Sequence, residues 1–430
     1  MHLIIHRGSK EIGGTCVELS AANSKILIDF GMPLVDGNQK PFDSKILIGK
    51  SVEDLKKCKI LPDIKGLYPG EKKAVDAILI SHSHMDHYGL LRYVHPDVLI
   101  YVSDGARRLI EISDIFIPSK VGKINSQELP KNQKTMIGDL AVTSFLVDHS
   151  AFDALAFLIE VDGKRLFYSG DFRAHGRKSK LFDRMLIDPP KNVDCLLMEG
   201  SMLGRSSQRY EDETAVEDGM VKILRKKKNL AFLFVSSQNI DRLVSAYRAC
   251  LKTDSTFVID VYTAYILHEL GSISKYIPQF NWRNIRIKFF KYHADSLANA
   301  GYKELLYLFK GKKIEMEEIN ANKEKMLMVL RDNSLFPRVL NKMNGVAGAT
   351  IIYSMWEGYL TDKFKDFCNE KGITIEQVHT SGHATLGDLQ DFASAINPKV
   401  LIPIHTFEPK KYVELFENVK ILEDGEELTI

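Results

Sequence analysis

The sequence has few cysteines, and none of them are closely paired. Only five occur in 430 residues, and they are widely scattered with no C-x-x-C pair. A disulfide framework and a zinc site built from paired thiolates are therefore not predicted. This cysteine usage is typical of a reducing compartment, so we expect a cytoplasmic protein.

Long hydrophobic runs are also missing. The longest, LAFLFV (230–235), is far shorter than the roughly 20 apolar residues that span a membrane. The opening MHLIIHRGSK has too short an apolar stretch for a signal peptide. We therefore expect no membrane partner. The sequence contains no internal repeat or low-complexity tract, and its length favours two domains or one domain with a large insertion.

Charge is divided unevenly along the chain. Apolar residues make up 45% and charged residues 27%, as in ordinary globular proteins, and the net charge is +2. Residues 206–345 contain 23 Lys and Arg against 16 Asp and Glu, which leaves +7 there and −5 in the remainder. A basic middle segment fits an insert that binds a polyanion, and it fits a solvated helical surface equally well.

The first half of the chain predicts β-strands. Short apolar and β-branched runs bounded by Gly, Asp and Pro are typical of strands. Six such runs are 25–30, 74–80, 98–103, 154–160, 165–170 and 195–200. The VDGK segment (161–164) between two of them predicts a hairpin turn.

The pattern changes after residue 206. An amphipathic helix is predicted over 211–228, acidic early and basic late, and a second helix (239–251) lies between strands at 230–237 and 255–260. Later strands are predicted at 349–355, 373–380 and 400–406, with a helix at 386–396. We therefore predict one α/β domain, formed by 1–205 and 346–430, interrupted by a second α/β domain over 206–345.

The stretch SHSHMDHYGL (81–90) concentrates ligand-type side chains directly after a predicted strand. His82 and His84 are two residues apart on an extended segment and therefore point the same way, while Asp86 and His87 follow. A polar turn is the simpler interpretation, but four ligand-type residues in six favour a metal site. Imidazoles mixed with carboxylates suit two adjacent ions, with one carboxylate bridging them.

Further candidate ligands follow other predicted strands. His149 in FLVDHSAFDA, Asp171 in LFYSGDFR and His405 in VLIPIHT each come directly after an apolar run. Residues at such strand ends lie on one rim of a sheet. The sequence therefore predicts a metal centre shared by several strand ends.

The order of these motifs resembles the metallo-β-lactamase superfamily. The matching elements are Asp29 in LIDFG, the H-x-H-x-D-H cluster, His149 and Asp171. Glu199 in LLMEGS, His383 in HTSGHA and His405 in IPIHT narrow the resemblance to the β-CASP branch, which includes ribonuclease J and the pre-mRNA 3′-end-processing endonuclease. The opening GSKEIGG (8–14) also looks like the first hairpin of the family.

The resemblance implies a role for each motif residue. One zinc would be held by His82, His84 and His149, and the other by Asp86, His87 and His405, with manganese as an alternative at this second site. Asp171 would bridge the two ions, and Asp29 would orient a histidine ligand. The implied catalytic residues are Asp86, His383 and Glu199, the last two as a pair near the leaving group. His379 and Ser381 would contact a substrate phosphate.

The resemblance also implies a fold and an activity. The fold would be an αββα sandwich interrupted by a β-CASP α/β insert. The activity would be metal-dependent cleavage of single-stranded RNA with low sequence specificity, exo- or endonucleolytic, and a homodimer is compatible with it. The alternative is a related hydrolase acting on DNA or on a small ester or phosphodiester; His383, His405 and the long insert weigh against it. The segment IYSMWEGY (352–359) only partly matches the family's Ser-x-Met-x-Gly-Gly stretch.

Overall fold

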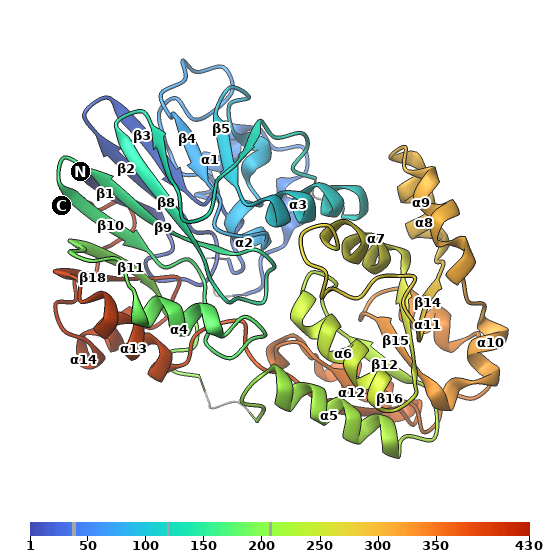
Figure 1. The fold of residues 1–430 in the computed structure, drawn as a ribbon. Helices are drawn as coiled ribbons and strands as arrows, with labels where there is room; N and C mark the ends of the chain where they lie inside the picture. Colours follow the sequence, from blue (N-terminus) through green and yellow to red (C-terminus); the bar gives the residue numbers. More distant parts are fainter. Residues whose placement is uncertain (37–39, 118–119, 206–208) are drawn as a thin grey trace. The chain divides into compact units, whose positions relative to one another are not determined.

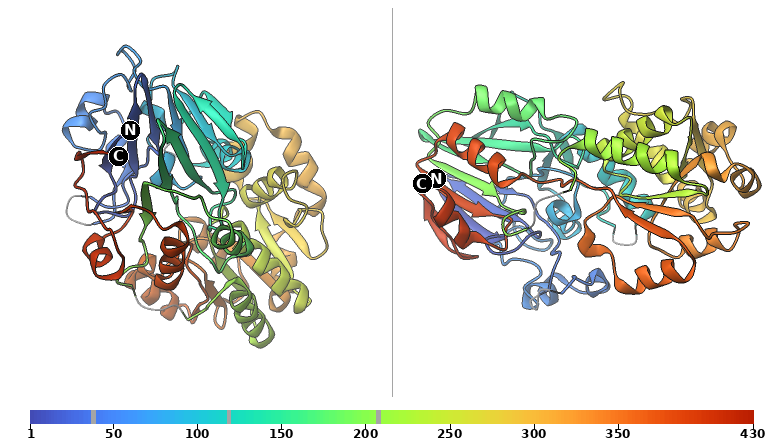
Figure 2. Two further views of the ribbon diagram at one scale, coloured as in Figure 1. Left: turned by 60° about the vertical axis from the view of Figure 1, so that its left-hand side comes forward. Right: turned by 90° about the horizontal axis from the view of Figure 1, so that it is seen from below.

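The chain forms two compact units. The computed structural model describes residues 1–36, 40–117, 120–205 and 209–430, and Figure 1 and Figure 2 show it from three directions. The first unit consists of Met1–Ser206 with Gly382–Ile430, and the second is Ser207–Ser381. The second boundary therefore differs from the predicted one at 345/346. The reason is that the strands following residue 346 extend the parallel sheet of the second unit.

Two sheets make up the centre of the first unit. In spatial order, the seven-stranded sheet contains β19 (Glu427–Thr429), β1 (His2–Arg7), β2 (Cys16–Ala21), β3 (Ser24–Ile28), β4 (Ala77–Leu79), β5 (Leu99–Val102) and β6 (Ser126–Glu128). The six-stranded sheet contains β18 (Val400–Ile404), β11 (Cys195–Glu199), β10 (Lys164–Tyr168), β9 (Leu155–Val161), β8 (Leu140–Leu146) and β7 (Lys134–Ile137). All six strands predicted in the first half are present.

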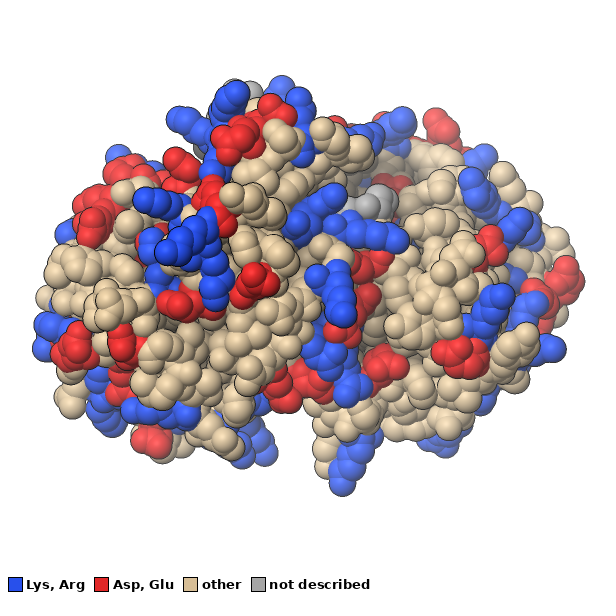
Figure 3. All heavy atoms as spheres, turned by 90° about the horizontal axis from the view of Figure 1, so that it is seen from above, with Lys and Arg blue, Asp and Glu red and all other residues tan. Residues whose placement is uncertain are grey.

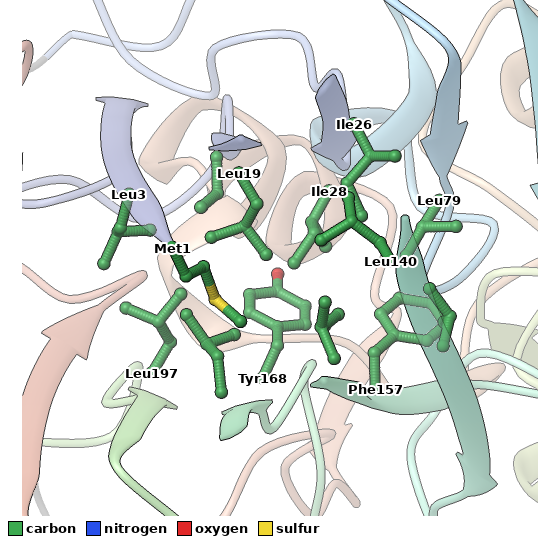
Figure 4. Packing of buried hydrophobic residues seen from close by; sticks show 14 of the residues in the cluster. Met1, Leu3, Leu19, Ile26, Ile28, Leu79, Leu140, Phe157, Tyr168 and Leu197 are labelled. Atoms are coloured by element: carbon green, nitrogen blue, oxygen red, sulfur yellow. The ribbon is translucent and has the colours of Figure 1, made fainter. Parts of the chain in front are cut away.

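The main core of this unit lies between the two sheets. Apolar side chains alternate along the strands, so that one face of each sheet points inward. Figure 4 shows these side chains converging from both sheets, among them Leu19, Ile28, Phe157 and Leu197, all of them buried. Tyr168 lies in the same cluster and carries its hydroxyl into it. Burial of these residues fixes the register of both sheets and hence the positions of their strand ends.

Helices cover the outer faces of both sheets. The seven-stranded sheet packs against α1 (Val52–Lys57) and α3 (Asp104–Phe116), and the six-stranded sheet against α4 (Lys180–Ile187), α13 (Leu386–Ile396) and α14 (Pro409–Leu415) (Figure 1). The predicted αββα sandwich is therefore confirmed. The hairpin at 161–164 is confirmed as well: Asp162 and Gly163 both have positive φ, 50° and 73°, as a tight turn between antiparallel strands requires.

The second unit is built on one parallel sheet. Its strands, in spatial order, are β14 (Ile285–Lys288), β13 (Thr256–Asp260), β15 (Met326–Leu330), β12 (Ala231–Phe234), β16 (Thr350–Tyr353) and β17 (Thr374–Gln377). The larger helices are α5 (Glu213–Lys226), α6 (Ile240–Lys252), α7 (Val261–Leu270), α8 (Lys291–Asn299) and α12 (Asp362–Glu370), and the shorter ones are α9 (Lys303–Phe309), α10 (Met316–Ala321) and α11 (Leu335–Leu340). Every strand pair is parallel, which confirms the predicted α/β unit.

The cysteines and the helices bear on two further expectations from the sequence, the absence of disulfides and of membrane-spanning segments. All five cysteines lie within the described ranges, and none of them is in a disulfide; Cys58 is exposed and the other four are buried. In the part of the chain that the structure describes, the helices are too short or too polar to cross a bilayer.

Candidate metal centre

The histidine cluster lies where β4 leads into the short helix α2 (Met85–Tyr88). His84 has extended backbone angles (φ −89°, ψ 142°), so it and His82 point to the same side before the helix begins. Asp86 and His87 lie in the first turn of α2 and are buried. The change from extended chain to helix thus divides the four ligand-type side chains into two pairs.

Three imidazoles form the first group. His82 Nε2 lies 3.1 Å from His84 Nδ1, and His149 Nε2 lies 3.3 Å from the same atom. In a tetrahedral site with Zn–N bonds of about 2.05 Å, ligand nitrogens are separated by about 3.3 Å. The three nitrogens therefore have the spacing that a shared metal ion requires, and they form one of the groups able to hold one.

The second group contains Asp86, His87 and His405. The Nε2 atoms of both histidines lie 3.8 Å from Asp86 Oδ2. Asp171 lies between the two groups: its Oδ2 is 3.2 Å from His87 Nε2, 3.5 Å from His405 Nε2 and 3.7 Å from His82 Nε2. The structure therefore brings all seven predicted ligands together, with Asp171 in the position of a bridging carboxylate.

The donor set fits a pair of cations. Three buried atoms of these residues, His87 Nε2, His405 Nε2 and Asp171 Oδ1, lack a hydrogen-bond partner among the described residues. Buried polar atoms without a partner are rare, and metal coordination is one way in which proteins satisfy them. Neutral imidazole nitrogens combined with carboxylate oxygens are the ligands preferred by zinc and similar divalent ions.

Asp29 holds His87 of the second group in place through a hydrogen bond. Its carboxylate accepts hydrogen bonds from His87 Nδ1, Ser81 Oγ and Tyr168 OH, each at 2.8 Å, and from the Ser81 amide at 2.7 Å. Because Nδ1 of His87 donates to Asp29, Nε2 of His87 is left as the ligand atom. Asp29 therefore lies beside a candidate ligand, His87, as the resemblance implied, and orients its ring.

Other histidines are oriented by partners that sequence reasoning missed. His149 Nδ1 donates to the carbonyl oxygen of Gly382, which leaves Nε2 facing the first group. The Gly13 amide donates to His405 Nδ1 at 3.3 Å, and the Thr15 hydroxyl lies 3.1 Å from the same nitrogen. Thr15 and Tyr168 are common residue types in strands, and their roles depend on contacts across the sandwich. No local signal in the sequence would have identified them.

The protonation of the centre is set by burial and by its carboxylates. Burial lowers the pKa of His82 and of His149 well below the ordinary value and lowers that of His84 to about 4, so these rings are neutral. Burial also lowers the pKa of His87, but Asp171, Asp29 and Asp86 outweigh it and raise that pKa. His87 therefore favours a positive charge, whereas burial outweighs Asp171 and Asp86 and lowers the pKa of His405; the first group offers neutral ligands.

Glu199 and His383 form a pair beside the candidate metal ligands. Glu199, at the end of β11, accepts hydrogen bonds from the Phe172 and Ser201 amides at 3.2 Å and 3.0 Å, and His383 Nδ1 lies 3.2 Å from its Oε1. His383 Nδ1 is also 3.8 Å from Asp171 Oδ2. The predicted pairing of Glu199 with His383 is thus present in the structure, and the His383 side chain keeps 22% of its surface exposed.

The two predicted phosphate-contacting residues lie in the other unit. His379 and Ser381 follow β17 and belong to the compact unit Ser207–Ser381. His379 Nδ1 lies 3.2 Å from a guanidinium nitrogen of Arg242. Their contact with a substrate stays a prediction.

Comparisons with known proteins agree with this architecture. The family described as "Beta-lactamase superfamily domain" matches residues 63–234, and the one described as "Zn-dependent metallo-hydrolase RNA specificity domain" matches residues 372–417. A protein of unknown function from Enterococcus faecalis has a similar structure, with a TM-score of 0.78, 23% identity, and coverage of 100% of this chain and 99% of its own.

Curated relatives carry the name ribonuclease J. The protein of that name from Sinorhizobium meliloti is 24% identical over 371 residues, which is 80% of this chain and 60% of the relative. Its namesake from Helicobacter pylori is 21% identical over 411 residues, covering 93% and 55%. This chain therefore spans little more than half the length of the relatives it matches.

The αββα sandwich with imidazoles and carboxylates at its strand ends defines a metallo-β-lactamase fold. The parallel α/β unit inserted after β11 and the match to the RNA specificity domain narrow this class further. The chain is ribonuclease J-like, and these matches support its resemblance to the β-CASP branch of the metallo-β-lactamase superfamily.

Proposed function

We propose that the chain is a metal-dependent hydrolase that cleaves RNA phosphodiester bonds. The observation that carries this proposal is the position of His383 and His405. Both lie in the segment that matches the RNA specificity domain, and both lie within the metal centre. The name of the curated relatives, ribonuclease J, supports the same substrate class. Cleavage at internal positions of an RNA strand and cleavage from one of its ends are both compatible with the metal centre.

The ligands fit two divalent cations, which we propose to be zinc. His82, His84 and His149 would hold one ion, Asp86, His87 and His405 the other, and Asp171 both. When bound, such a pair supplies a water nucleophile at neutral pH and stabilises negative charge on phosphoryl oxygens. Asp29 and the Gly382 carbonyl keep the rings of His87 and His149 in the required tautomers.

We propose His383 as the general acid for the leaving group. Burial lowers the pKa of His383, but Glu199 and, to a lesser degree, Asp171 outweigh it, and the pKa is raised above the ordinary value. Protonation of the imidazole is therefore favoured over that of an ordinary histidine, and the protonated ring can give a proton to the departing sugar oxygen. Glu199 is itself held by the amides of Phe172 and Ser201, which fixes the direction of the pair.

The insert unit is proposed to hold the RNA backbone. Residues 207–381 carry 26 Lys and Arg against 21 Asp and Glu, a net charge of +5. On the one face of the whole chain that Figure 3 draws, blue Lys and Arg side chains are interspersed with red Asp and Glu. The net positive charge of the unit suits phosphate contacts that position a strand without reading its bases, and therefore low sequence specificity.

A direct assay tests this function. Purified protein is incubated with 5′-labelled single-stranded RNA and with DNA of the same sequence, with and without a chelator. We expect RNA cleavage that chelation abolishes and that added zinc or manganese restores. Asp86→Asn should be inactive, whereas His2→Ala, an exposed histidine on β1, should match the wild type. Preferential cleavage of DNA, or RNA cleavage unchanged by chelation, would contradict the proposal.

A further inference from the structure

Arg242 is the residue in the insert unit around which a buried polar network is organised. It lies on α6 with no exposed surface. Its Nε and one terminal nitrogen donate to the Glu213 carboxylate at 3.0–3.3 Å, and Glu213 also accepts from Ser245 Oγ at 2.8 Å. A charge-assisted fork of this kind fixes the plane of the guanidinium, because the carboxylate binds the two donors along one of its edges.

The other donors of Arg242 reach the chain that follows β17. One terminal nitrogen donates to the Thr380 carbonyl at 3.0 Å, and the other to the Ser354 carbonyl at 3.0 Å and to His379 Nδ1 at 3.2 Å. Ser354 Oγ, which also accepts from Arg242, donates to the Val378 carbonyl. Three consecutive residues, 378–380, are therefore tied to one buried guanidinium and the hydroxyl beside it.

The contact with Arg242 determines which nitrogen of the His379 ring carries the proton. A guanidinium has only donors, so the nitrogen it contacts must be an acceptor. Nδ1 of His379 is consequently unprotonated, and the single proton of the neutral ring lies on Nε2. Nε2 of His379 is thereby a hydrogen-bond donor at neutral pH. A phosphate oxygen, which only accepts, is complementary to such an atom.

We propose that Arg242 is a positioning residue for substrate binding, which acts by holding His379 in its Nε2–H tautomer and by fixing residues 378–380. This inference rests on the proposed function, because the phosphate that His379 would contact belongs to RNA. Ser354 shares the task through its hydroxyl, which gives a physical role to the serine of a stretch, 352–359, that only partly matches the family pattern. Arg242 itself is buried and does not touch the substrate.

The tautomer of His379 can be measured directly. The full chain is labelled with ¹⁵N-histidine, and the His379 signals are assigned by their loss in His379→Gln. Imidazole ¹⁵N shifts distinguish protonated from unprotonated nitrogens. We expect the Nε2–H tautomer in the wild type and a mixture of tautomers in Arg242→Met. Arg248→Met is the matched control, since Arg248 lies on the same helix with 57% of its side chain exposed.

A second variant keeps the test decisive if Arg242→Met does not fold. Arg242→Lys retains the positive charge beside Glu213 but lacks the planar fork, so His379 should again populate both tautomers. A wild-type ring protonated on Nδ1 would overturn the inference. So would an unchanged tautomer in every Arg242 variant that folds, as judged by circular dichroism.

Measurements of RNA binding distinguish a positioning role of Arg242 from a role in structural support alone. Dissociation constants for single-stranded RNA are measured in chelator, where no cleavage occurs. Loss of one hydrogen bond to a charged group should weaken binding roughly tenfold in Arg242→Met. In a His379→Gln background the amide can donate without help from Arg242, so the same change should cost only about twofold. Equal losses in both backgrounds would overturn the positioning role.

The two proposals fail in different ways. If the wild type neither binds nor cleaves RNA, the proposed function is wrong, while the ¹⁵N experiment still decides the tautomer. If the wild type cleaves RNA and Arg242→Met changes neither KM nor the dissociation constant, the proposed function stands and the role of Arg242 is refuted. A rise in KM with kcat largely kept is the expected signature of lost substrate binding.

Discussion

Gly31 lies directly against the backbone of Asp86. A methyl group on Gly31 would be 1.6 Å from the Asp86 carbonyl oxygen, a separation that no packed structure tolerates. The neighbouring amides of Phe30 and Met32 donate to the carbonyls of His87 and Met85 at 2.8 Å and 2.9 Å. The segment after β3 is therefore bonded to α2 along its length, and the glycine allows this approach.

The first prediction follows from that contact. Gly31→Ala should push α2 away from β3 and displace Asp86 and His87, because the clash is with backbone atoms that cannot rotate aside. We expect a loss of roughly 1–3 kcal/mol of stability and a reduced metal content. Gly387→Ala is the control, since a methyl group there meets only Thr385 Oγ1 at 3.8 Å. Denaturation midpoints and elemental analysis report both effects; equal metal content in the two variants would contradict the prediction.

The second prediction concerns Asp171. Its Oδ2 lies within 3.8 Å of ligand atoms from both groups, so its removal should affect both ions at once. We expect Asp171→Ala to lose both ions, or to bind them weakly, and to be inactive. Metal content after dialysis is the measurement. Retention of two tightly bound ions with full activity would show that Asp171 does not bridge.

The positions of the candidate metal ligands were predictable because these residues follow a local rule. The cluster at 82–87 follows β4 of the seven-stranded sheet, and His149, Asp171 and His405 follow strands of the six-stranded sheet, so strand ends from both sheets meet at the site. His149, Asp171 and His405 could therefore be placed beside the H-x-H-x-D-H cluster without a structure. Thr15 and Tyr168 could not, because their partners lie across the sandwich and their residue types are ordinary in strands.

The position of the second domain boundary could not be inferred from the local sequence pattern. The strand at 350–353 is apolar and the strand at 374–377 is mostly polar; strands of both kinds occur in the first unit, so local pattern cannot tell which sheet they join. Their partners decide it: β16 pairs with β12, and β17 with β16, both in parallel. These pairings join residues far apart in sequence, and no local propensity encodes such a choice.

The third prediction refines the role of the basic end of α5. Arg225, Lys226 and Lys228 are exposed, whereas Lys227 is turned inward. Replacing the three exposed residues with Gln should weaken RNA binding at low salt. It should also reduce the dependence of log Kd on log salt concentration by up to about 2, the counterion release expected for three phosphate contacts to a single strand. Binding measured across a salt series tests this. An unchanged slope would mean that these cations only solvate the helix end.

Lys227→Met serves as the contrasting variant. Its ammonium group donates to the carbonyls of Asn229, Lys323 and Glu324, and burial lowers its pKa to about 8. Those contacts tie the end of α5 to a distant turn. We therefore expect Lys227→Met to lower the denaturation midpoint while leaving the salt dependence of RNA binding unchanged.

The fourth prediction concerns acid stability of the insert unit. Asp260 is buried, which raises its pKa, but Arg331, His293 and hydrogen bonds from Thr263 outweigh this and lower it. Because the folded pKa lies below the unfolded value of about 3.9, the carboxylate stabilises the fold at neutral pH. That contribution is lost as pH falls below about 4 through the folded pKa. The stability difference between wild type and Asp260→Asn should therefore shrink in acid.

Denaturation midpoints at pH 7 and below pH 4 measure that difference. Asp254→Asn is the control, because the Asp254 carboxylate is 87% exposed and its ion pair with Lys325 is long, at 3.8 Å. It should change stability little at either pH, since exposed pairs of this kind contribute at most about 1 kcal/mol. A difference for Asp260→Asn that stays constant with pH would argue against an ionised Asp260.

The fifth prediction separates His383 from the metal ligands by leaving-group chemistry. Cleavage of an RNA phosphodiester expels a sugar alkoxide, a poor leaving group unless it is protonated as the bond breaks. General acid catalysis of such a step is typically worth about 10²–10⁴-fold. A p-nitrophenyl phosphodiester expels a stable phenolate that needs no proton. His383→Ala should therefore lose most RNA cleavage and keep much of its p-nitrophenyl activity.

Two further variants make the comparison decisive. Asp86→Asn disturbs a candidate ligand and should lose both activities together. Glu199→Gln removes the carboxylate that, with Asp171, raises the pKa of His383, so its RNA cleavage should fall at neutral pH and recover partly in mild acid, where the ring is protonated again. The p-nitrophenyl reaction of that variant should lack this recovery. If His383→Ala instead reduced both reactions equally, His383 would be supporting the metal centre through its 3.8 Å approach to Asp171 Oδ2 rather than donating a proton.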